Sequence, residues 1–147
     1  MKLYIYMFLS LSLLFSCKSN DIVYTADSTE GDKIIFGNGG GFAGTVTSYI
    51  LFDNGQMFMK APGKENYVSH KKLERKICKQ IFENADNLGL KDMTIDDPGN
   101  MYYFVEFVNK EEKKKLLWGG QQVADPILKA YYQNLFSLAK RKIAVKE

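Results

Sequence analysis

The chain has 147 residues, with 20 Lys and Arg against 17 Asp and Glu, one His and two Cys. Its net charge of +3 is too balanced for a nucleic-acid-binding protein, which concentrates cations on one surface. One histidine and two cysteines supply few ligands for a zinc-type site, so we expect no metal and no cofactor.

The first 17 residues have the layout of an exported bacterial precursor. Lys2 precedes an apolar run over residues 3–15, which is too short to span a bilayer and has the length of a signal peptide. The sequence Leu14-Phe15-Ser16-Cys17 looks like a lipobox, with an aliphatic residue three positions before the cysteine. This resemblance implies that residues 1–16 are removed and that Cys17 carries lipid. The alternative is an ordinary signal peptide that ends near a cysteine.

Lipid on Cys17 would place the protein in the bacterial cell envelope, on the periplasmic face or on the outer-membrane surface. Two or three acyl chains attach a protein stably, because each buried methylene contributes roughly 0.8 kcal/mol. Once Cys17 is modified, Cys78 has no partner for a disulfide. We therefore expect a buried and inert thiol at Cys78 and a domain stabilised by packing.

The remaining chain divides into a tether, one domain and a tail. Residues 17–32 are mostly polar and predict a flexible tether. The folded domain is expected over residues 33–142, with a tail at 143–147. Strands are predicted at residues 33–36, 45–52 and 56–60, and Asn54-Gly55 predicts a type I′ hairpin turn between the last two.

From residue 70 the spacing of the apolar residues becomes that of an amphipathic helix. The sequence predicts an amphipathic helix over residues 70–88, with Ser69 as N-cap and Gly89 just past its end. Its expected apolar stripe consists of Leu73, Ile77, Ile81, Phe82, Ala85 and Leu88. Strands follow at residues 101–108 and 114–118.

The closing helix is predicted over residues 126–142. Asp125 is a suitable N-cap, and Pro126 fits the first helical position because its missing N–H is not needed there. One side of this helix is expected to bury Ile127, Tyr131, Leu135 and Leu138.

The predicted fold class is α+β, in the element order βββαββα. Strands linked by hairpins favour an antiparallel sheet, here of about five strands. Two amphipathic helices are enough to cover one face of such a sheet. We expect a single domain and a monomer.

A glycine-rich run is the most distinctive motif in the domain. Gly39-Gly40-Gly41-Phe42-Ala43-Gly44 formally matches a dinucleotide-binding pattern, but that site needs a helix after the motif, and a strand is predicted instead. Two interpretations remain open. The glycines form a bulge that joins two strands, or the loop and Phe42 bind a partner chain, since glycine permits close backbone approach and an aromatic ring is a good anchor.

Other polar groups favour structural roles. Asp92, Asp96, Asp97 and Asn100 do not have EF-hand spacing, so we interpret them as a solvated turn. His70 is expected at a helix start with no nucleophile motif around it. The charged segment 109–115 predicts a solvated hairpin tip, with contact to anionic lipid as the alternative. Trp118 is expected at the sheet edge or in the core. We predict no enzymatic activity.

The glycine motif and the order of elements together resemble a known family. Gly40-Gly41-Phe42-Ala43-Gly44, the Tyr102-Tyr103-Phe104 strand and the proline-started helix are similar to emfourins, which are small bacterial protein inhibitors of thermolysin-like metalloproteases. The similarity covers residues 35–139. The lipoprotein leader, the longer tether and the Pro98-Gly99-Asn100 turn depart from the family pattern.

Three functional hypotheses follow. The resemblance implies a protein-binding module, with metalloprotease inhibition as its most specific form and residues Gly39 to Gly44 as its partner-binding loop. The alternative is a structural or assembly lipoprotein of the envelope, in which an uncovered strand edge or an apolar patch near Trp118 meets a partner. An enzyme would need polar groups that converge in a pocket.

Overall fold

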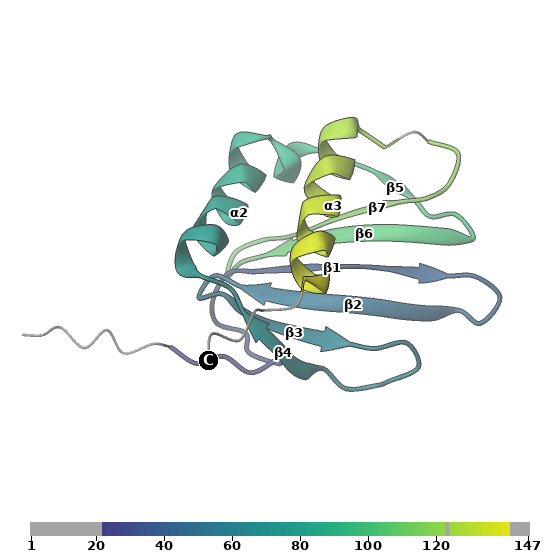
Figure 1. The fold of residues 1–147 in the computed structure, drawn as a ribbon. Helices are drawn as coiled ribbons and strands as arrows, with labels where there is room; N and C mark the ends of the chain where they lie inside the picture. Colours follow the sequence, from purple (N-terminus) through teal and green to yellow (C-terminus); the bar gives the residue numbers. More distant parts are fainter. Residues whose placement is uncertain (1–21, 123, 142–147) are drawn as a thin grey trace, which may run out of the picture.

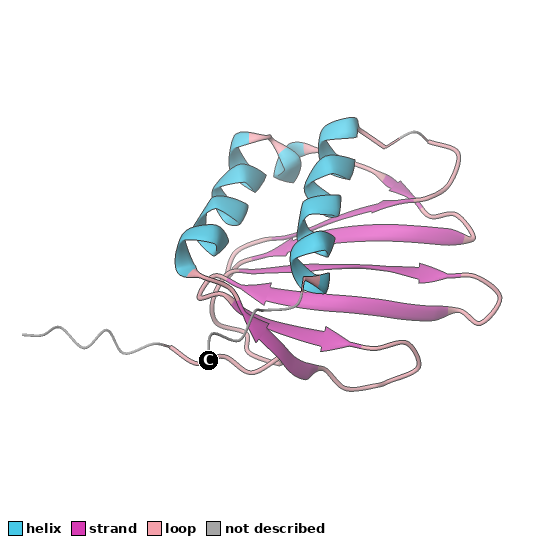
Figure 2. Ribbon diagram, in the orientation of Figure 1, coloured by secondary structure: helices cyan, strands magenta, loops and turns pink. Residues whose placement is uncertain are grey.

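The computed structural model describes residues 22–122 and 124–141, in which two helices lie on the same face of one sheet (Figures 1 and 2). The helices are α2 (Arg75–Asn87) and α3 (Pro126–Lys140), and a short 3-10 helix, η2 (Leu90–Asp92), follows α2. The strands of the described residues are β1 (Lys33–Gly40), β2 (Thr45–Phe52), β3 (Gln56–Lys60), β4 (Val68–Lys72), β5 (Asp96–Asp97), β6 (Met101–Val108) and β7 (Lys113–Trp118).

The sheet has seven strands in the order β4-β3-β2-β1-β6-β7-β5. The α+β class is confirmed, but the expected sheet of about five antiparallel strands is wrong in two ways. The polar strand β4 and the two-residue strand β5 are additional, and β5 runs parallel to β7, which makes the sheet mixed. Both additional strands are too short or too polar for a periodic signal, so pairing with neighbours creates them.

The main core lies between the helices and one face of the sheet. Alternate residues of the central strands point toward the helices because side chains in a strand alternate between faces. Phe36, Leu51 and Val105 from the sheet meet Ile81 of α2 and Leu128 of α3, all at most 3% exposed. Removal of this apolar surface from water stabilises the fold by about 25 cal/mol per Å².

Helix α2 begins five residues later than predicted. Residues 70–72 belong to the edge strand β4, and Glu74, not Ser69, is the N-cap residue. Its buried residues are Cys78, Ile81 and Ala85, of which Ile81 and Ala85 were in the predicted stripe, whereas Leu88 at the C-cap is 41% exposed. The prediction for the C-terminal end is confirmed, since Gly89 has the left-handed φ of 64°.

The predicted start of helix α3 is confirmed. The Asp125 carboxylate accepts a hydrogen bond of 2.7 Å from the Ile127 amide, and Pro126 occupies the first turn. Tyr131 and Leu135 are buried as expected, but Ile127 is 46% exposed. The buried face instead includes Leu128, Tyr132 and Ala139, and the helix ends at Lys140, two residues before the predicted end.

The turn between β2 and β3 is not of type I′. That turn requires positive φ at two central residues, and among the described residues only glycines have positive φ. Residues 53–55 form a three-residue loop in which Gly55 (φ 89°) donates to the Phe52 carbonyl over 2.9 Å.

Residues 22–32 are not a flexible tether. The Tyr24 ring stacks on Phe52 at 4.7 Å, and its backbone N–H donates to the Gln56 side chain over 2.7 Å. Asn54 also donates to the Ile22 carbonyl over 2.7 Å. The cause is the second face of the sheet, where Ile50 and Phe52 need an apolar cover. Cys17, the leader and the predicted tail at 143–147 lie outside the described residues.

Candidate functional site

The glycine-rich run forms the tip of the β1–β2 hairpin. We call residues Gly41, Phe42, Ala43 and Gly44 the glycine tip. Gly40 pairs with Thr45 to close the hairpin, and the Gly44 amide donates to the Gly41 carbonyl over 3.0 Å. The predicted loop was therefore two residues too long at its start, because Gly39 and Gly40 belong to β1, where Gly39 is buried.

Gly40 and Gly44 have backbone conformations that favour glycine, and so does Gly41, with a φ of 74°. Gly40 has a φ of 102°, and a Cβ atom there would lie 2.0 Å from the Asn100 carbonyl oxygen. Gly44 has open space around it, but its φ is 58°. Residues with a Cβ atom rarely adopt this left-handed conformation. The interpretation of the glycines as strand-joining residues therefore accounts for these positions. It does not account for Phe42.

Phe42 is the most exposed large hydrophobic side chain in the described part of the chain. Its exposure is 110% of the reference value, so its ring has no contact that stabilises the fold. The neighbours Ala43 and Gly44 are also exposed. Met101, whose sulfur lies 3.3 Å from the position of a Cβ on Gly41, is 48% exposed. Phe42 and Met101 together form an apolar corner at this end of the sheet.

The adjacent turn holds the glycine tip in place. The Gly41 amide donates to the Asn100 carbonyl over 2.7 Å, which joins the tip to the residue before β6. The preceding aspartates are structural in this arrangement. Asp97 in β5 accepts from the Gln122 amide over 2.6 Å, and its carbonyl accepts from Gly120 over 2.8 Å. The oxygen-rich stretch predicted as a solvated turn thus includes a short strand that fixes the β7–α3 loop.

The side chains of His70 and Cys78 each bond to a backbone carbonyl of another part of the fold. His70 lies in β4, not at a helix start, and its Nε2 donates to the Ala139 carbonyl over 2.8 Å. Cys78 is fully buried and free, and its thiol donates to the Phe52 carbonyl over 3.2 Å. Burial raises the pKa of the Cys78 thiol to about 11, so it stays protonated near neutral pH. The Cys78 thiol is therefore expected to be unreactive.

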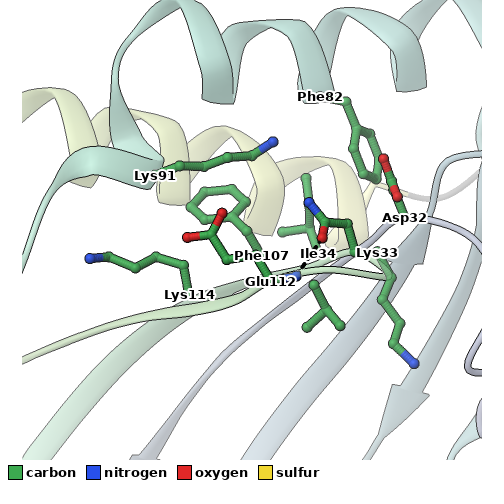
Figure 3. A pocket seen from close by; sticks show the side chains of 10 residues that line it. Asp32, Lys33, Ile34, Phe82, Lys91, Phe107, Glu112 and Lys114 are labelled. Atoms are coloured by element: carbon green, nitrogen blue, oxygen red, sulfur yellow. Dashed lines mark hydrogen bonds between the residues drawn. The ribbon is translucent and has the colours of Figure 1, made fainter.

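The charged segment between β6 and β7 is ordered by its own side chains. Asn109 accepts from the Glu111 and Glu112 amides at 2.8 and 2.7 Å. Lys113 pairs with Glu106 at 2.9 Å, and Lys114 donates to Thr94. Figure 3 shows the small hollow beside this hairpin, with Glu112 and Lys114 of the hairpin and Phe82 of α2 among the residues that line it. Its volume of about 20 Å³ holds about one water molecule.

A second surface lies beside α3, in the region of Trp118 where the assembly-lipoprotein hypothesis predicts an apolar patch. A hollow of about 370 Å³ opens between this helix and the uncovered end of the sheet. We call it the α3 groove. It is lined by Asn38, Tyr103, Trp118, Lys129, Tyr132, Gln133 and Phe136. Trp118 lies in the main core, which confirms one of its two predicted positions. It is 5% exposed and also forms part of the groove wall.

Within residues 22–122 and 124–141, no three His, Cys, Asp or Glu side chains are grouped closely enough to hold a metal ion. The helices of this same part of the chain are not long and apolar enough to cross a membrane. No protein-family model matches the sequence, and no protein with a curated description matches it. The emfourin resemblance therefore stays a prediction.

Proposed function

We propose that this chain is a lipid-anchored, non-catalytic protein-binding module of the bacterial envelope and that the glycine tip is its docking element. The observation that carries the proposal is Phe42, a fully exposed aromatic ring on a tip fixed by two paired strands and by the Asn100 hydrogen bond. Aromatic residues at the centre of an interface commonly supply much of the binding free energy.

The tip is suited to enter a cleft in a partner. Its other residues are two glycines and an alanine, so Phe42 projects without bulky neighbours. Burial of a Phe side chain contributes about 1.5–3 kcal/mol. Because the hairpin is already ordered, little conformational entropy is lost on binding.

The position of the N-terminal segment favours a tip that faces away from the membrane. Ile22 is bonded to Asn54 in the β2–β3 turn, which lies at the end of β2 opposite the glycine tip (Figure 1). Five residue steps separate Ile22 from Cys17, a reach of about 17 Å at full extension. With lipid on Cys17, the β2–β3 turn would lie near the bilayer and Phe42 would point outward.

The most specific form of the proposal is inhibition of a thermolysin-like metalloprotease. It is supported by the emfourin resemblance and by the slender, apolar tip. The test is a titration of the full chain, purified in a non-ionic detergent, against such a protease acting on a peptide substrate. Stoichiometric loss of protease activity is expected.

Three variants locate the contact. Phe42→Ala should weaken inhibition by about tenfold or more, in line with about 1.4 kcal/mol per decade. Ala43→Arg should also weaken it, because Ala43 is exposed and lacks positive φ, so a larger side chain blocks entry without straining the fold. Val68→Ala is the matched control, since Val68 is 62% exposed on β4, which β3 separates from the β1–β2 hairpin. Full inhibition by Phe42→Ala would overturn the role of the tip.

Absence of inhibition at micromolar protein would refute the inhibitor form and favour the alternative, a structural or assembly lipoprotein. One observation supports that alternative. Among the described residues β4 pairs only with β3 and leaves its outer edge open, although Lys71 and Lys72 on it oppose strand addition. A photocrosslinking residue at position 42 and one at position 68 would then distinguish tip contact from edge contact.

A further inference from the structure

Two exposed aliphatic side chains lie at the start of the described chain. Ile22 is 60% exposed and Val23 is 78% exposed, and they are the one adjacent pair among the exposed large hydrophobic side chains of residues 22–122 and 124–141. The next residue, Tyr24, is buried and stacks on Phe52. The fold therefore buries the chain immediately after the pair and leaves the pair itself in water. Exposed apolar side chains that are grouped in this way are suited to contact with a partner or a membrane.

The folded domain fixes the position of this pair. The Asn54 side chain donates to the Ile22 carbonyl over 2.7 Å, so the pair lies beside the β2–β3 loop. The Leu73 amide donates to the Gly55 carbonyl over 2.9 Å, which brings the start of α2 to the same loop. We call Ile22, Val23, the β2–β3 loop and the first turn of α2 the anchor end of the domain. The anchor end and the glycine tip lie at opposite ends of the sheet (Figure 1).

Charged side chains of both signs surround Ile22. A hollow of about 500 Å³ lies between Ile22, the β2–β3 loop and α2. Its charged lining consists of Asp32, Asp53, Arg75, Lys79, Glu83 and Asp86. Glu83 pairs with Lys79 at 3.5 Å, and Asp86 pairs with Lys91 at 2.5 Å. A surface of mixed charge complements zwitterionic lipid headgroups, each of which carries a phosphate and an ammonium group.

The first turn of α2 carries cations that do not stabilise the helix. Arg75 and Lys76 are its first two residues, both are exposed, and no acidic residue lies in this turn. The helix dipole favours acids at this position and disfavours cations. A nearby layer of phosphates would stabilise both cations, so their position favours a lipid surface as the partner of the anchor end.

We propose that the anchor end binds the bilayer surface directly, with Ile22 and Val23 inserted among the lipid headgroups. This inference rests on the lipid anchor at Cys17 that belongs to the proposed function. Cys17 lies five residue steps before Ile22, so the pair stays within about 17 Å of the lipidated residue. At that distance even a weak contact is formed most of the time, because the anchor makes its effective concentration high. The second contact stops the domain from turning and holds the glycine tip away from the membrane.

Quenching of a fluorescent label by lipid measures which end of the domain faces the bilayer. The full chain, with lipid on Cys17 verified by mass, is placed in phosphatidylcholine nanodiscs that contain spin-labelled headgroups. The label is attached in separate variants, Glu74→Cys at the anchor end and Ala43→Cys at the tip. Glu74 makes no side-chain cap hydrogen bond, and Cys78 is buried, so neither the substitution nor the native thiol interferes. Quenching at position 74 should exceed quenching at position 43 about threefold or more, because only the anchor end reaches the headgroups. Equal quenching at both positions would overturn the proposal.

Variants of the aliphatic pair test its role. The double variant Ile22→Ser and Val23→Ser should lose the difference in quenching between the two positions, because the inserted apolar surface is gone. Val68→Ser is the matched control, since Val68 is 62% exposed and pairs with Met59, at the end of β3 away from the β2–β3 loop. The control should keep the difference. An unchanged difference in the double variant would overturn the insertion of Ile22 and Val23.

Salt separates apolar insertion from attraction between charges. Because salt screens exposed charges, a contact made by the aliphatic pair should keep its difference in quenching within about twofold between about 50 and 500 mM NaCl. Loss of the difference at high salt would overturn the insertion.

Failure of this contact is distinguishable from failure of the proposed function. The protease titration is carried out in detergent, without a bilayer, so its result does not depend on the anchor end. A chain whose mass shows no lipid on Cys17 would overturn the anchor and this contact together. A lipidated chain with equal quenching at positions 74 and 43 would overturn this contact alone.

Discussion

Tyr24→Ala tests whether residues 22–32 are part of the folded domain. Tyr24 is 8% exposed, stacks on Phe52 and is bonded through its backbone to Gln56. A Cβ added at Gly31 would lie 2.5 Å from the ring, which shows how closely the segment folds around it. Truncation to alanine removes the ring and leaves Phe52 open to water.

The expected loss can be worked out from these contacts. Burial of a large apolar side chain contributes about 1.5–3 kcal/mol, and an aromatic pair adds about 0.5–1.5 kcal/mol. Against this, release of residue 24 alone from its ordered conformation recovers about 1–2 kcal/mol of backbone entropy. A net decrease of about 2 kcal/mol in the free energy of unfolding is the expected result.

Urea unfolding followed by circular dichroism measures this change, and Tyr24→Phe is the control because it keeps the ring. Tyr24→Phe should lower the free energy of unfolding by about 1 kcal/mol at most, because it keeps the ring and loses only the hydroxyl, which interacts with Asp53. A similarly small change for Tyr24→Ala would show that the segment is a free tether, as the sequence suggested, and would refute the argument from packing.

Three further predictions concern the backbone, the thiol and a helix cap. Gly40→Ala should lower the free energy of unfolding by about 3 kcal/mol, because its Cβ meets the Asn100 carbonyl oxygen and adds to the backbone strain. Gly63→Ala, with a φ of 70° and open space, should cost only about 1 kcal/mol in the same denaturant assay; equal costs would contradict the close approach. Cys78, measured in a Cys17→Ser background with iodoacetamide at pH 8, should react at least about a hundredfold more slowly when folded than when unfolded, since a pKa raised to about 11 reduces the thiolate fraction. The protonated thiol is the form that the fold favours, so this contribution to stability is complete below the unfolded pKa and is lost as the pH rises toward 11. Asp125→Ala should cost about 1 kcal/mol through loss of the bond to the Ile127 amide, whereas Asp125→Asn should restore most of it; equal loss in both would show that the cap is not the cause.

Local signals in the sequence determined much of the fold. The strands at 45–52, 56–60 and 101–108 were predicted with their observed bounds, because β-branched and aromatic residues were bounded by turn residues. Asp125-Pro126 and Gly89 marked a helix start and a helix end correctly. In each case the residues concerned act on backbone groups within a few positions, so no distant contact is needed.

The exposed glycine tip was also partly predictable. The run of glycines excluded a helix and indicated a strand connection, which the structure confirms. The sequence could not show that Gly40 approaches the Asn100 carbonyl, since these residues are 60 positions apart. Nor could it show that Phe42 lacks a packing partner.

The tertiary structure decided the features that depend on distant residues. Strand β4 forms where a helix was predicted, because β3 offers an open edge. Tyr24 packs on Phe52 because the second face of the sheet needs an apolar cover. The α3 groove brings Asn38 of β1 to Tyr103 of β6, Trp118 of β7 and Lys129 of α3. Hydrophobic burial has no direction along the chain. Local signals therefore determined strands such as β2, β3 and β6 and the start of α3, while pairing and packing determined β4, the start of α2 and which side chains meet.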